Sequence, residues 1–520
     1  MGAELFPCPF DLALINRFRV NWSTPSANRP GAPLLPLLVI TLATFGAARC
    51  HAAVSDEAIN SLVSAYSAQR VVSLNVGESC AFQLKSGARR VLKLIAVQEH
   101  RDSVLNLMAR AEVRIEIEGK PLELVCEPYT MPTELAGLRL LADSTAGWGN
   151  VPKTVQFSLW DAADPIVDTN RFGFPLRHYR FLSHGTQCYN EPVHLGAGDG
   201  DPAGQKFYHD YGFDLAGYEG KEQVVSATEG KVASFWPSLE HLCSVVVQDT
   251  NGFYWEYAHL KSLGPGIVLN AHLDKGQMIG ILGRTGPSGN FSHSHLGSYL
   301  TRHDLDTDNR DCRLNLYPWY VAAYQAQHPK GLLAVARPHR LALTGEQVLL
   351  DGSRSLAWGG ARIVQWRWVL PDGSTVTSHT AQTAFDKPGA YVAALWVEDN
   401  EGNQDVDFCQ IKVFSKSGPE RNMPHVFMTC TPTEGIRPNT PITVRLWFQG
   451  KGGGPISLDF DDGTRIADCK PYAALRHSFD QPGVHILTAQ CQAAGNPITA
   501  MLKVIVTSAQ QTRPTEEPDR

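Results

Sequence analysis

The chain has 520 residues, too many for one compact core, so its length favours three or four domains. Hydrophobic residues make up 43% of it and charged residues 19%, which is ordinary for a soluble globular protein. With a net charge of -6 the chain has no excess of basic residues, so we expect no nucleic-acid partner.

The first 53 residues have the layout of a secretory signal. Residues 32–46 are apolar and uncharged, with Arg17, Arg19 and Arg29 before them and small residues after them. The apolar run is shorter than the roughly 20 residues that a spanning helix needs. We therefore expect an exported protein, periplasmic or extracellular, with no stable membrane span once the signal is removed. A short uncleaved membrane anchor is the alternative.

The cysteines are scattered and form no Cys-x-x-Cys pair, so a zinc site made of cysteines is not expected. In an oxidising compartment some of them would pair. Their positions within the domains make Cys80 with Cys126 and Cys430 with Cys491 plausible pairs. The sequence alone does not fix the connectivity.

Residues 54–179 are predicted to form an N-terminal β-rich domain. The first of them, 54–69, have helical spacing. The segments VVSLNV, VLKLIAV, AEVRIEIEG and TVQFSLW then alternate apolar and polar side chains, as half-buried strands do.

Residues 180–330 form a second unit, rich in glycine, histidine and aromatic residues. Its clearest local signal is Asn251-Gly252, which stands between the strand patterns SVVVQDT and FYWEYAHL. An Asn-Gly pair in that position predicts a tight β-hairpin.

Residues 331–416 and 424–507 each consist of short strand patterns. WVLPDG in the first pairs with LDFDDG in the second, and KPGAYVAALWV pairs with QPGVHILTAQC, which indicates a diverged internal repeat of two β-sandwiches. Residues 508–520 are polar and are predicted to be a disordered tail. The fold class is therefore expected to be mainly β and multidomain.

Candidate chemistry is concentrated between residues 200 and 300. His293 and His295 are separated by one residue, so on a strand both side chains point to the same face. Together with His209 and Asp214 they offer imidazoles and a carboxylate, a donor set that suits zinc. Three protein ligands would leave a fourth position for water, as in catalytic zinc sites.

His259 closes the second strand of the predicted hairpin. It is expected to share a face with Phe253, Trp255 and Tyr257 and so to lie at the end of an aromatic wall.

These residues carry a resemblance to the lysostaphin/LytM-type zinc endopeptidases. The matching elements, in order, are His209-Asp-Tyr-Gly-Phe-Asp214, Tyr257-Ala-His259-Leu260, and Gly283-Arg-Thr-Gly286 followed by His293-Ser-His295. The resemblance implies an antiparallel β-sheet peptidase with Zn2+ held by His209, Asp214 and His295. It implies that His259 and His293 serve as catalytic groups acting on water and the oxyanion, with a peptide or peptidoglycan substrate.

The sequence departs from that family in two places. Four residues separate His209 from Asp214, where the family has three. The loop can carry one extra residue, Asp210 can replace His209 as a ligand, or the first ligand is lost. The second departure is HSHLGSYL, where the family usually has His-Leu-His-(Phe/Tyr)-Glu. A metal-free domain with a binding or regulatory role, or an adhesion scaffold, are the alternatives to an enzyme.

Residues 331–507 resemble two polycystic-kidney-disease (PKD) repeats. WVLPDGS and LDFDDGT stand where that family has its Trp-x-Phe-Gly-Asp-Gly-like strand. Such repeats imply either spacers or modules that contact polysaccharide or protein.

Overall fold

The computed structural model describes residues 55–149, 151–181, 186–194, 207–209, 212–238, 242–286, 288, 291–302, 314–417, 424–449, 453–493 and 495–508. They belong to one compact unit, His51–Arg520. The predicted signal segment, and all but the first residue of the predicted tail, lie outside these residues. Within the described ranges, no helix combines the length and apolarity needed to cross a membrane.

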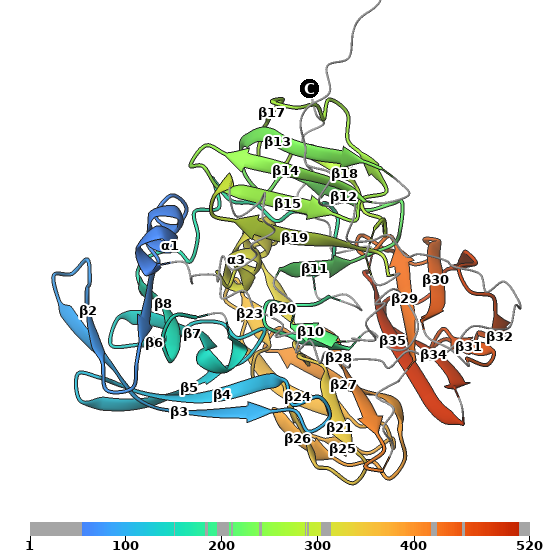
Figure 1. Ribbon diagram of the computed structural model, residues 1–520. Helices are drawn as coiled ribbons and strands as arrows, with labels where there is room; N and C mark the ends of the chain where they lie inside the picture. The colour runs from blue at the N-terminus through green and yellow to red at the C-terminus, as the bar shows by residue number, and fades with distance from the viewer. Residues whose placement is uncertain are drawn as a thin grey trace, which may run out of the picture. The chain divides into compact units, whose positions relative to one another are not determined.

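The N-terminal part has a short helix and two antiparallel sheets (Figure 1). The sheets have the orders β1-β8-β7-β6 and β2-β3-β4-β5. Their elements are α1 (Asp56–Val63), β1 (Arg70–Leu74), β2 (Ser79–Gln83), β3 (Arg89–Arg101), β4 (Met108–Ile117), β5 (Lys120–Cys126), β6 (Thr133–Leu135), β7 (Leu138–Thr145), η2 (Ala146–Trp148) and β8 (Val155–Asp161). The four predicted strand segments are confirmed as β1, β3, β4 and β8, whereas the helix is shorter than the helical pattern.

The predicted antiparallel sheet of the second unit has the strand order β11-β19-β15-β14-β13-β17. Its strands are β11 (Phe213–Ala216), β13 (Gly230–Pro237), β14 (Cys243–Asp249), β15 (Tyr254–Ala258), β17 (His272–Leu273) and β19 (His293–Tyr299). Around it lie β9 (Pro192–His194), β10 (Phe207–His209), β12 (Gln223–Val225), β16 (Ser262–Leu263), β18 (Met278–Ile281) and α3 (Tyr317–Gln327). The Asn251-Gly252 hairpin is confirmed, since β14 pairs with β15 across that turn.

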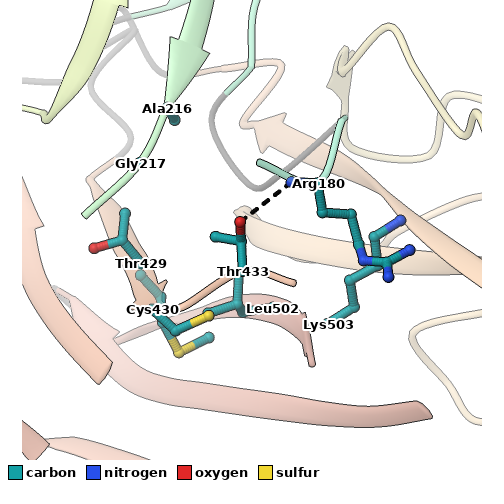
Figure 2. Close-up of a pocket in the computed structure, with 9 residues that line it drawn as sticks. Arg180, Ala216, Gly217, Thr429, Cys430, Thr433, Leu502 and Lys503 are labelled. Carbon is teal, nitrogen blue, oxygen red and sulfur yellow. Dashed lines mark hydrogen bonds between the residues drawn. The ribbon is translucent and has the colours of Figure 1, made fainter. Parts of the chain in front are cut away.

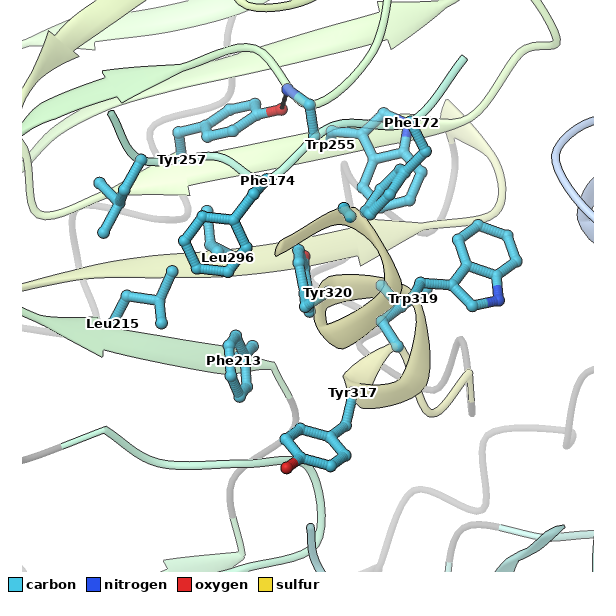
Figure 3. Packing of buried hydrophobic residues seen from close by; sticks show 14 of the residues in the cluster. Phe172, Phe174, Phe213, Leu215, Trp255, Tyr257, Leu296, Tyr317, Trp319 and Tyr320 are labelled. Atoms are coloured by element: carbon cyan, nitrogen blue, oxygen red, sulfur yellow. Dashed lines mark hydrogen bonds between the residues drawn. The ribbon is translucent and has the colours of Figure 1, made fainter. Parts of the chain in front are cut away.

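Strand alternation gives this sheet an apolar face and a polar face. Phe213, Trp255, Tyr257 and Leu296 are buried in one hydrophobic core with the aromatic side chains of α3 (Figure 3). Phe213 stacks on Tyr320 of α3 with ring centroids 4.9 Å apart. Because neighbouring side chains on a strand point to opposite faces, the residues between these positions face away from the core. Asp214, Glu256 and His295 are such residues.

The core under the sheet also includes residues from before position 180. Ile59 and Val63 of α1 and Phe172, Phe174 and Tyr179 are buried in it. Tyr66 joins the two parts directly, because its hydroxyl hydrogen-bonds to Asp249 Oδ2 at 2.5 Å. The segments that flank the N-terminal sheets therefore help to support the polar face. The domain boundary at 179/180 remains a prediction.

Two further β-rich parts follow. The first contains β20 (Gly331–Leu333), β21 (Arg340–Leu343), β22 (Val348–Asp351), β23 (Leu356–Trp358), β24 (Ile363–Val369), β25 (Thr375–Val376), β26 (Thr380–Thr383), β27 (Gly389–Asp399) and β28 (Gln404–Phe414). The second contains β29 (His425–Thr431), β30 (Ile442–Gln449), β31 (Ile456–Asp459), β32 (Arg465–Cys469), β33 (Leu475–His477), β34 (Gly483–Ala493) and β35 (Asn496–Val506). The expected mainly β, multidomain architecture is confirmed.

The two β-rich parts share a sheet. Ala390 on β27 pairs with Ile498 on β35, so one sheet runs through β21-β28-β27-β35-β34-β31-β32. The second part encloses its own core between β29-β30-β33 and β35-β34-β31-β32. The sequence repeat did not predict this continuity.

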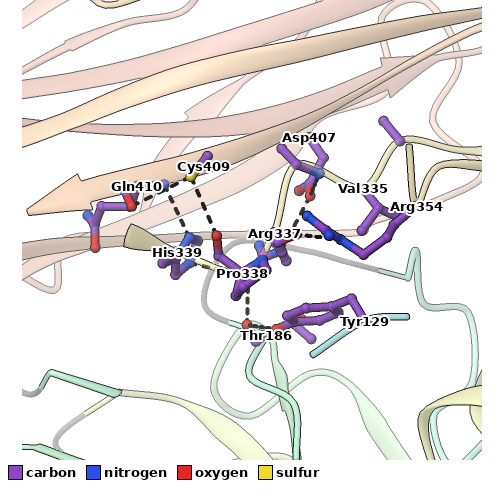
Figure 4. A network of polar contacts seen from close by, with 12 residues as sticks. Tyr129, Thr186, Val335, Arg337, Pro338, His339, Arg354, Asp407, Cys409 and Gln410 are labelled. Atoms are coloured by element: carbon purple, nitrogen blue, oxygen red, sulfur yellow. Dashed lines mark hydrogen bonds and ion pairs between the residues drawn. The ribbon is translucent and has the colours of Figure 1, made fainter. Parts of the chain in front are cut away.

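A buried polar network joins the first β-rich part to earlier segments (Figure 4). Arg337 pairs with Asp407 at 3.4 Å and donates to the Thr186 carbonyl at 2.6 Å. Tyr129 donates to the same carbonyl at 3.1 Å. Glu127 accepts from Arg354 at 2.8 Å. Buried charges need such partners, so the network fixes these segments against one another.

The suggested disulfides are wrong, because each cysteine that the structure describes is a free thiol. Cys80 lies on β2 and Cys126 on β5, at opposite edges of the sheet β2-β3-β4-β5. Three strand spacings of about 4.8 Å separate them, well beyond the roughly 7 Å Cα–Cα limit for a disulfide. Cys430 and Cys491 lie on β29 and β34, in different sheets.

Candidate active site

Asp214 and His295 meet on the polar face of the sheet. They are direct cross-strand partners on β11 and β19, and His295 Nδ1 lies 2.7 Å from Asp214 Oδ1. A second pairing holds β11 from its other side, since Gln187 and Asp214 exchange backbone hydrogen bonds of 3.0 Å. Two backbone ladders thus fix the carboxylate.

His293 joins the same cluster from the start of β19. Its Nε2 lies 3.4 Å from Asp214 Oδ2. His293 and His295 thus approach the two oxygens of one carboxylate from one face, as the one-residue spacing predicted.

His259 approaches from the end of β15. Its ring centroid lies 4.6 Å from that of His293 and 6.2 Å from that of His295. His259 has a φ of 61°, a left-handed conformation that is uncommon for residues other than glycine. The left-handed backbone ends the strand alternation. The expectation that His259 continues the wall of Phe253, Trp255 and Tyr257 is therefore wrong: that wall faces the core, and His259 faces the other histidines.

The connection between β18 and β19 orients two of the histidines. The Thr285 carbonyl lies 2.7 Å from His259 Nδ1, and the Phe291 carbonyl lies 3.1 Å from His293 Nδ1. A carbonyl only accepts, so each Nδ1 carries the hydrogen and each neutral ring has its lone pair on Nε2. Thr285 is itself anchored, since its hydroxyl donates to the Leu260 carbonyl at 3.0 Å and accepts from Cys243 N at 2.9 Å.

The cluster is buried. Asp214 and His293 are each 2% exposed, His295 is 7% and His259 is 9%. Burial, reinforced by the neighbouring His293 and His295, lowers the pKa of His259 to about 3, so this ring is neutral at neutral pH. Burial also lowers the pKa of His293. Burial alone would raise the pKa of Asp214, but attraction to His293 and His295 holds it below its ordinary value.

The second departure from the family pattern, in the segment HSHLGSYL, lies on β19 beside Glu256 of β15. Gly297 stands where that pattern has a glutamate, and it pairs with Glu256 on β15. A methyl group added at Gly297 would lie 3.1 Å from Glu256 Oε2. Glu256 accepts from the Tyr299 hydroxyl at 2.8 Å. The carboxylate of Glu256, from the neighbouring strand, thus lies beside the position where the family has its glutamate.

The first expected ligand, His209 or Asp210, lies outside the described side chains. His209 ends β10, where its backbone pairs with Pro192 of β9, but its side chain and Asp210 lie outside what the structure describes. Among the described side chains, no group of three or more His, Cys, Asp or Glu has an arrangement that could hold a metal ion.

The described donors nevertheless fit a cation. A neutral His293 would turn its Nε2 lone pair toward Asp214 Oδ2 at 3.4 Å, and two acceptors so close need a proton or a cation between them. A tetrahedral zinc ion with bonds of about 2.0–2.1 Å holds its donor atoms about 3.3 Å apart. His295 Nδ1 and Asp214 Oδ1 are 2.7 Å apart, so they need to open by about 0.6 Å to share such an ion.

Some functional geometry was missed by the sequence reasoning. Thr285 stands in the Gly283-Arg-Thr-Gly286 element, but the motif gave no indication that its carbonyl orients His259. Nothing in the sequence pattern connected Phe291 with His293.

Comparison with known proteins supports this organisation of the chain. Residues 208–307 match peptidase family M23, and residues 333–413 match the PKD domain. The first match spans Asp214 and the three clustered histidines. No curated protein matches the chain.

Solved structures that are similar to parts of the chain include two peptidases and a PKD domain. A protein assigned as a glycyl-glycine endopeptidase LytM from Ruminococcus gnavus is 22% identical, with a TM-score of 0.20 over 29% of this chain and 61% of its own. The lysostaphin catalytic domain from Staphylococcus simulans is 21% identical, with a TM-score of 0.17 over 20% of this chain and 75% of its own. A PKD domain from the KIAA 1837 protein is 25% identical, with a TM-score of 0.15 over 17% of this chain and 93% of its own. The chain thus spans less than two thirds of the length of the first of these relatives.

Proposed function

We propose that the domain at residues 180–330 is a zinc-dependent endopeptidase that hydrolyses peptide bonds in peptidoglycan. The observation that carries the proposal is the convergence of one carboxylate and three imidazoles on the polar face of a single sheet. The match of residues 208–307 to peptidase family M23 supports it.

In this proposal Asp214 and His295 hold the zinc ion, with His209 or Asp210 as a third ligand. Zinc bound there would act as a Lewis acid toward the scissile carbonyl and make water a stronger acid. Asp214 is suited to this role because its carboxyl stays ionised.

His259 and His293 are proposed to move protons and to stabilise the oxyanion. Each has its Nδ1–H held by a backbone carbonyl, so its Nε2 carries the lone pair that would take a proton from water and return it to the leaving amine. In His293 this lone pair faces Asp214 Oδ2 at 3.4 Å. Burial keeps His259 neutral at neutral pH, so its Nε2 is unprotonated before the reaction. The burial of both rings strengthens their electrostatic interactions with a developing charge.

We further propose that the protein is exported to the cell envelope or beyond, where peptidoglycan lies. The PKD-like repeats would serve as spacers or contact polysaccharide or protein. This part of the proposal rests on the signal-like segment and on the PKD match at residues 333–413.

The test combines metal analysis with digestion of purified peptidoglycan, followed by mass spectrometry of the released fragments. The wild-type protein is expected to hold about one zinc per chain and to release peptides. His295→Ala should lose both zinc and hydrolysis, whereas His259→Ala should keep zinc and lose hydrolysis. A protein without zinc that releases nothing would favour a metal-free binding or regulatory domain.

A further inference from the structure

The C-terminal β-sandwich reaches the histidine cluster through stacked aromatic rings. Phe291 stacks on His293, with centroids 3.9 Å apart and planes 12° from parallel. Phe427 of β29 stacks on Phe291 at 5.1 Å and 6°. Trp447 of β30 stacks on Phe427 at 5.3 Å, and Tyr472 stacks on Trp447 at 6.0 Å.

The register of the C-terminal sheet explains why it presents these rings. Phe427 and Trp447 are cross-strand partners and share a face, while Val426 and Met428 point into the module's own core. Phe427 and Trp447 are buried with Ala216 and Phe291 in a separate cluster. The outer face of β29 and β30 is therefore an apolar contact surface and not a solvated one.

A second contact holds the other end of the β18–β19 connection. The Arg284 guanidinium lies 4.6 Å from the Tyr472 ring centroid and pairs with Glu219 through Nε at 3.0 Å. Arg445 of β30 approaches the same Glu219 carboxylate at 3.6 Å and lies over the Tyr218 ring. The C-terminal module thus touches the connection at Arg284 and at Phe291, on either side of Thr285 and next to both carbonyls that orient the histidines.

A third contact of the C-terminal β-sandwich involves Thr433 and the segment that contains His178 and Arg180. Thr433, which follows β29, accepts a hydrogen bond from Arg180 N at 3.2 Å through its hydroxyl (Figure 2). The same hydroxyl donates to the His178 carbonyl at 3.1 Å. Ala216 and Gly217, at the end of β11, line the small cavity there together with Thr429 and Cys430. The contact therefore reaches from the β18–β19 connection to the strand that carries Asp214.

We propose that the C-terminal β-sandwich, residues 424–507, positions the histidines of the active site, with Phe427 as a positioning residue. It holds Phe291 flat against His293 and keeps the carbonyls of Thr285 and Phe291 where they orient His259 and His293. Phe427 touches no reacting atom and acts only through Phe291. This inference rests on the proposed function for its kinetic consequences, but its structural content is independent of it.

The kinetic test uses the full chain. A displacement of a catalytic group by about 1 Å can cost about a hundredfold in rate, so Phe427→Ala is expected to lower kcat at least tenfold and to change KM less than threefold. Phe427→Tyr keeps the ring and is expected to restore most of the loss. Phe448→Ala is the matched control, since Phe448 lies beside Trp447 on β30 but packs against the module's own core. It is expected to leave kcat unchanged.

A second readout does not need activity. In protein labelled with 13C-histidine, the His293 ring protons should be shifted by the ring current of Phe291, and a His293→Gln variant assigns the signal. Phe427→Ala should move this signal toward the unshifted position, and Phe448→Ala should not.

The two proposals fail in different ways. A wild-type protein that cleaves nothing contradicts the proposed function, whereas the histidine spectra still decide the positioning role. A folded Phe427→Ala protein with the wild-type His293 signal overturns the inference, and so does one with wild-type kcat. If Phe427→Ala does not fold, Phe427→Leu takes its place with the same expected results, because it removes the ring and keeps apolar volume.

Discussion

Gly212→Ala is the substitution whose effect on the cluster can be worked out most directly. A methyl group on this residue would lie 2.7 Å from His295 Cε1, 3.0 Å from His295 Nε2 and 2.7 Å from the Leu296 carbonyl oxygen. The Leu296 oxygen belongs to the backbone of β19 inside the sheet, so it cannot yield easily. The His295 imidazole can move more easily than the Leu296 carbonyl.

The size of the effect follows from these distances. Ordinary contacts of a methyl carbon begin near 3.4 Å, so the His295 ring and the methyl group must separate by about 0.7 Å. A metal or catalytic site loses function when its groups move more than about 0.5 Å from the productive geometry. We therefore expect Gly212→Ala to weaken zinc binding about tenfold to a hundredfold, with a loss of hydrolysis of similar size.

Zinc affinity is measured by competition with a chromophoric chelator, and folding is checked by the thermal unfolding midpoint. Gly173→Ala is the matched control, because its added methyl group would meet Lys275 at an ordinary 3.5 Å, away from the cluster. Wild-type zinc affinity in a folded Gly212→Ala protein would show that His295 does not bind the metal from this position.

Three other predictions concern stability and metal. Burial raises the pKa of Asp143 to about 8, above the value of about 3.9 expected in the unfolded chain. Its contribution to folding is therefore fully present below about pH 4 and is lost as the pH rises toward 8, at up to about 1.4 kcal/mol per pH unit. Asp143→Asn should flatten the fall of the unfolding midpoint between pH 5 and 8, and parallel curves for both proteins would contradict this. Arg337→Ala should cost about 3–5 kcal/mol in urea unfolding, because it leaves the buried Asp407 carboxylate without its guanidinium, whereas Arg337→Met with Asp407→Leu should cost less. Treatment with a chelator should abolish hydrolysis and added zinc should restore it; activity that survives complete metal removal would contradict a zinc mechanism.

Local sequence signals predicted the parts of the site that depend on strand geometry. The Asn251-Gly252 turn specified the β14–β15 hairpin, and the one-residue spacing of His293 and His295 specified their common face. The cross-strand pairing of Asp214 with His295 followed only when β11 was placed beside β19, which no local pattern specifies.

Contacts between distant segments could not be predicted in the same way. The left-handed backbone at His259 breaks an alternation that the sequence pattern continues. Most residues of helix α3 are buried, because core packs around most of it, so it shows no amphipathic pattern. The stacking of Phe427 on Phe291 depends on how the C-terminal β-sandwich packs against the sheet that carries the histidines. These two residues are 136 positions apart, and no local pattern in a single sequence indicates such a contact.

The proposed function requires that Asp214 and His295 hold one zinc ion on the polar face of the sheet. A crystal structure of the zinc-loaded protein, with anomalous scattering recorded on either side of the zinc absorption edge, tests it directly. We expect a single zinc peak about 2.0–2.2 Å from Asp214 Oδ1 and His295 Nδ1. A zinc-loaded crystal with no peak there, or with its peak at another site, would contradict it.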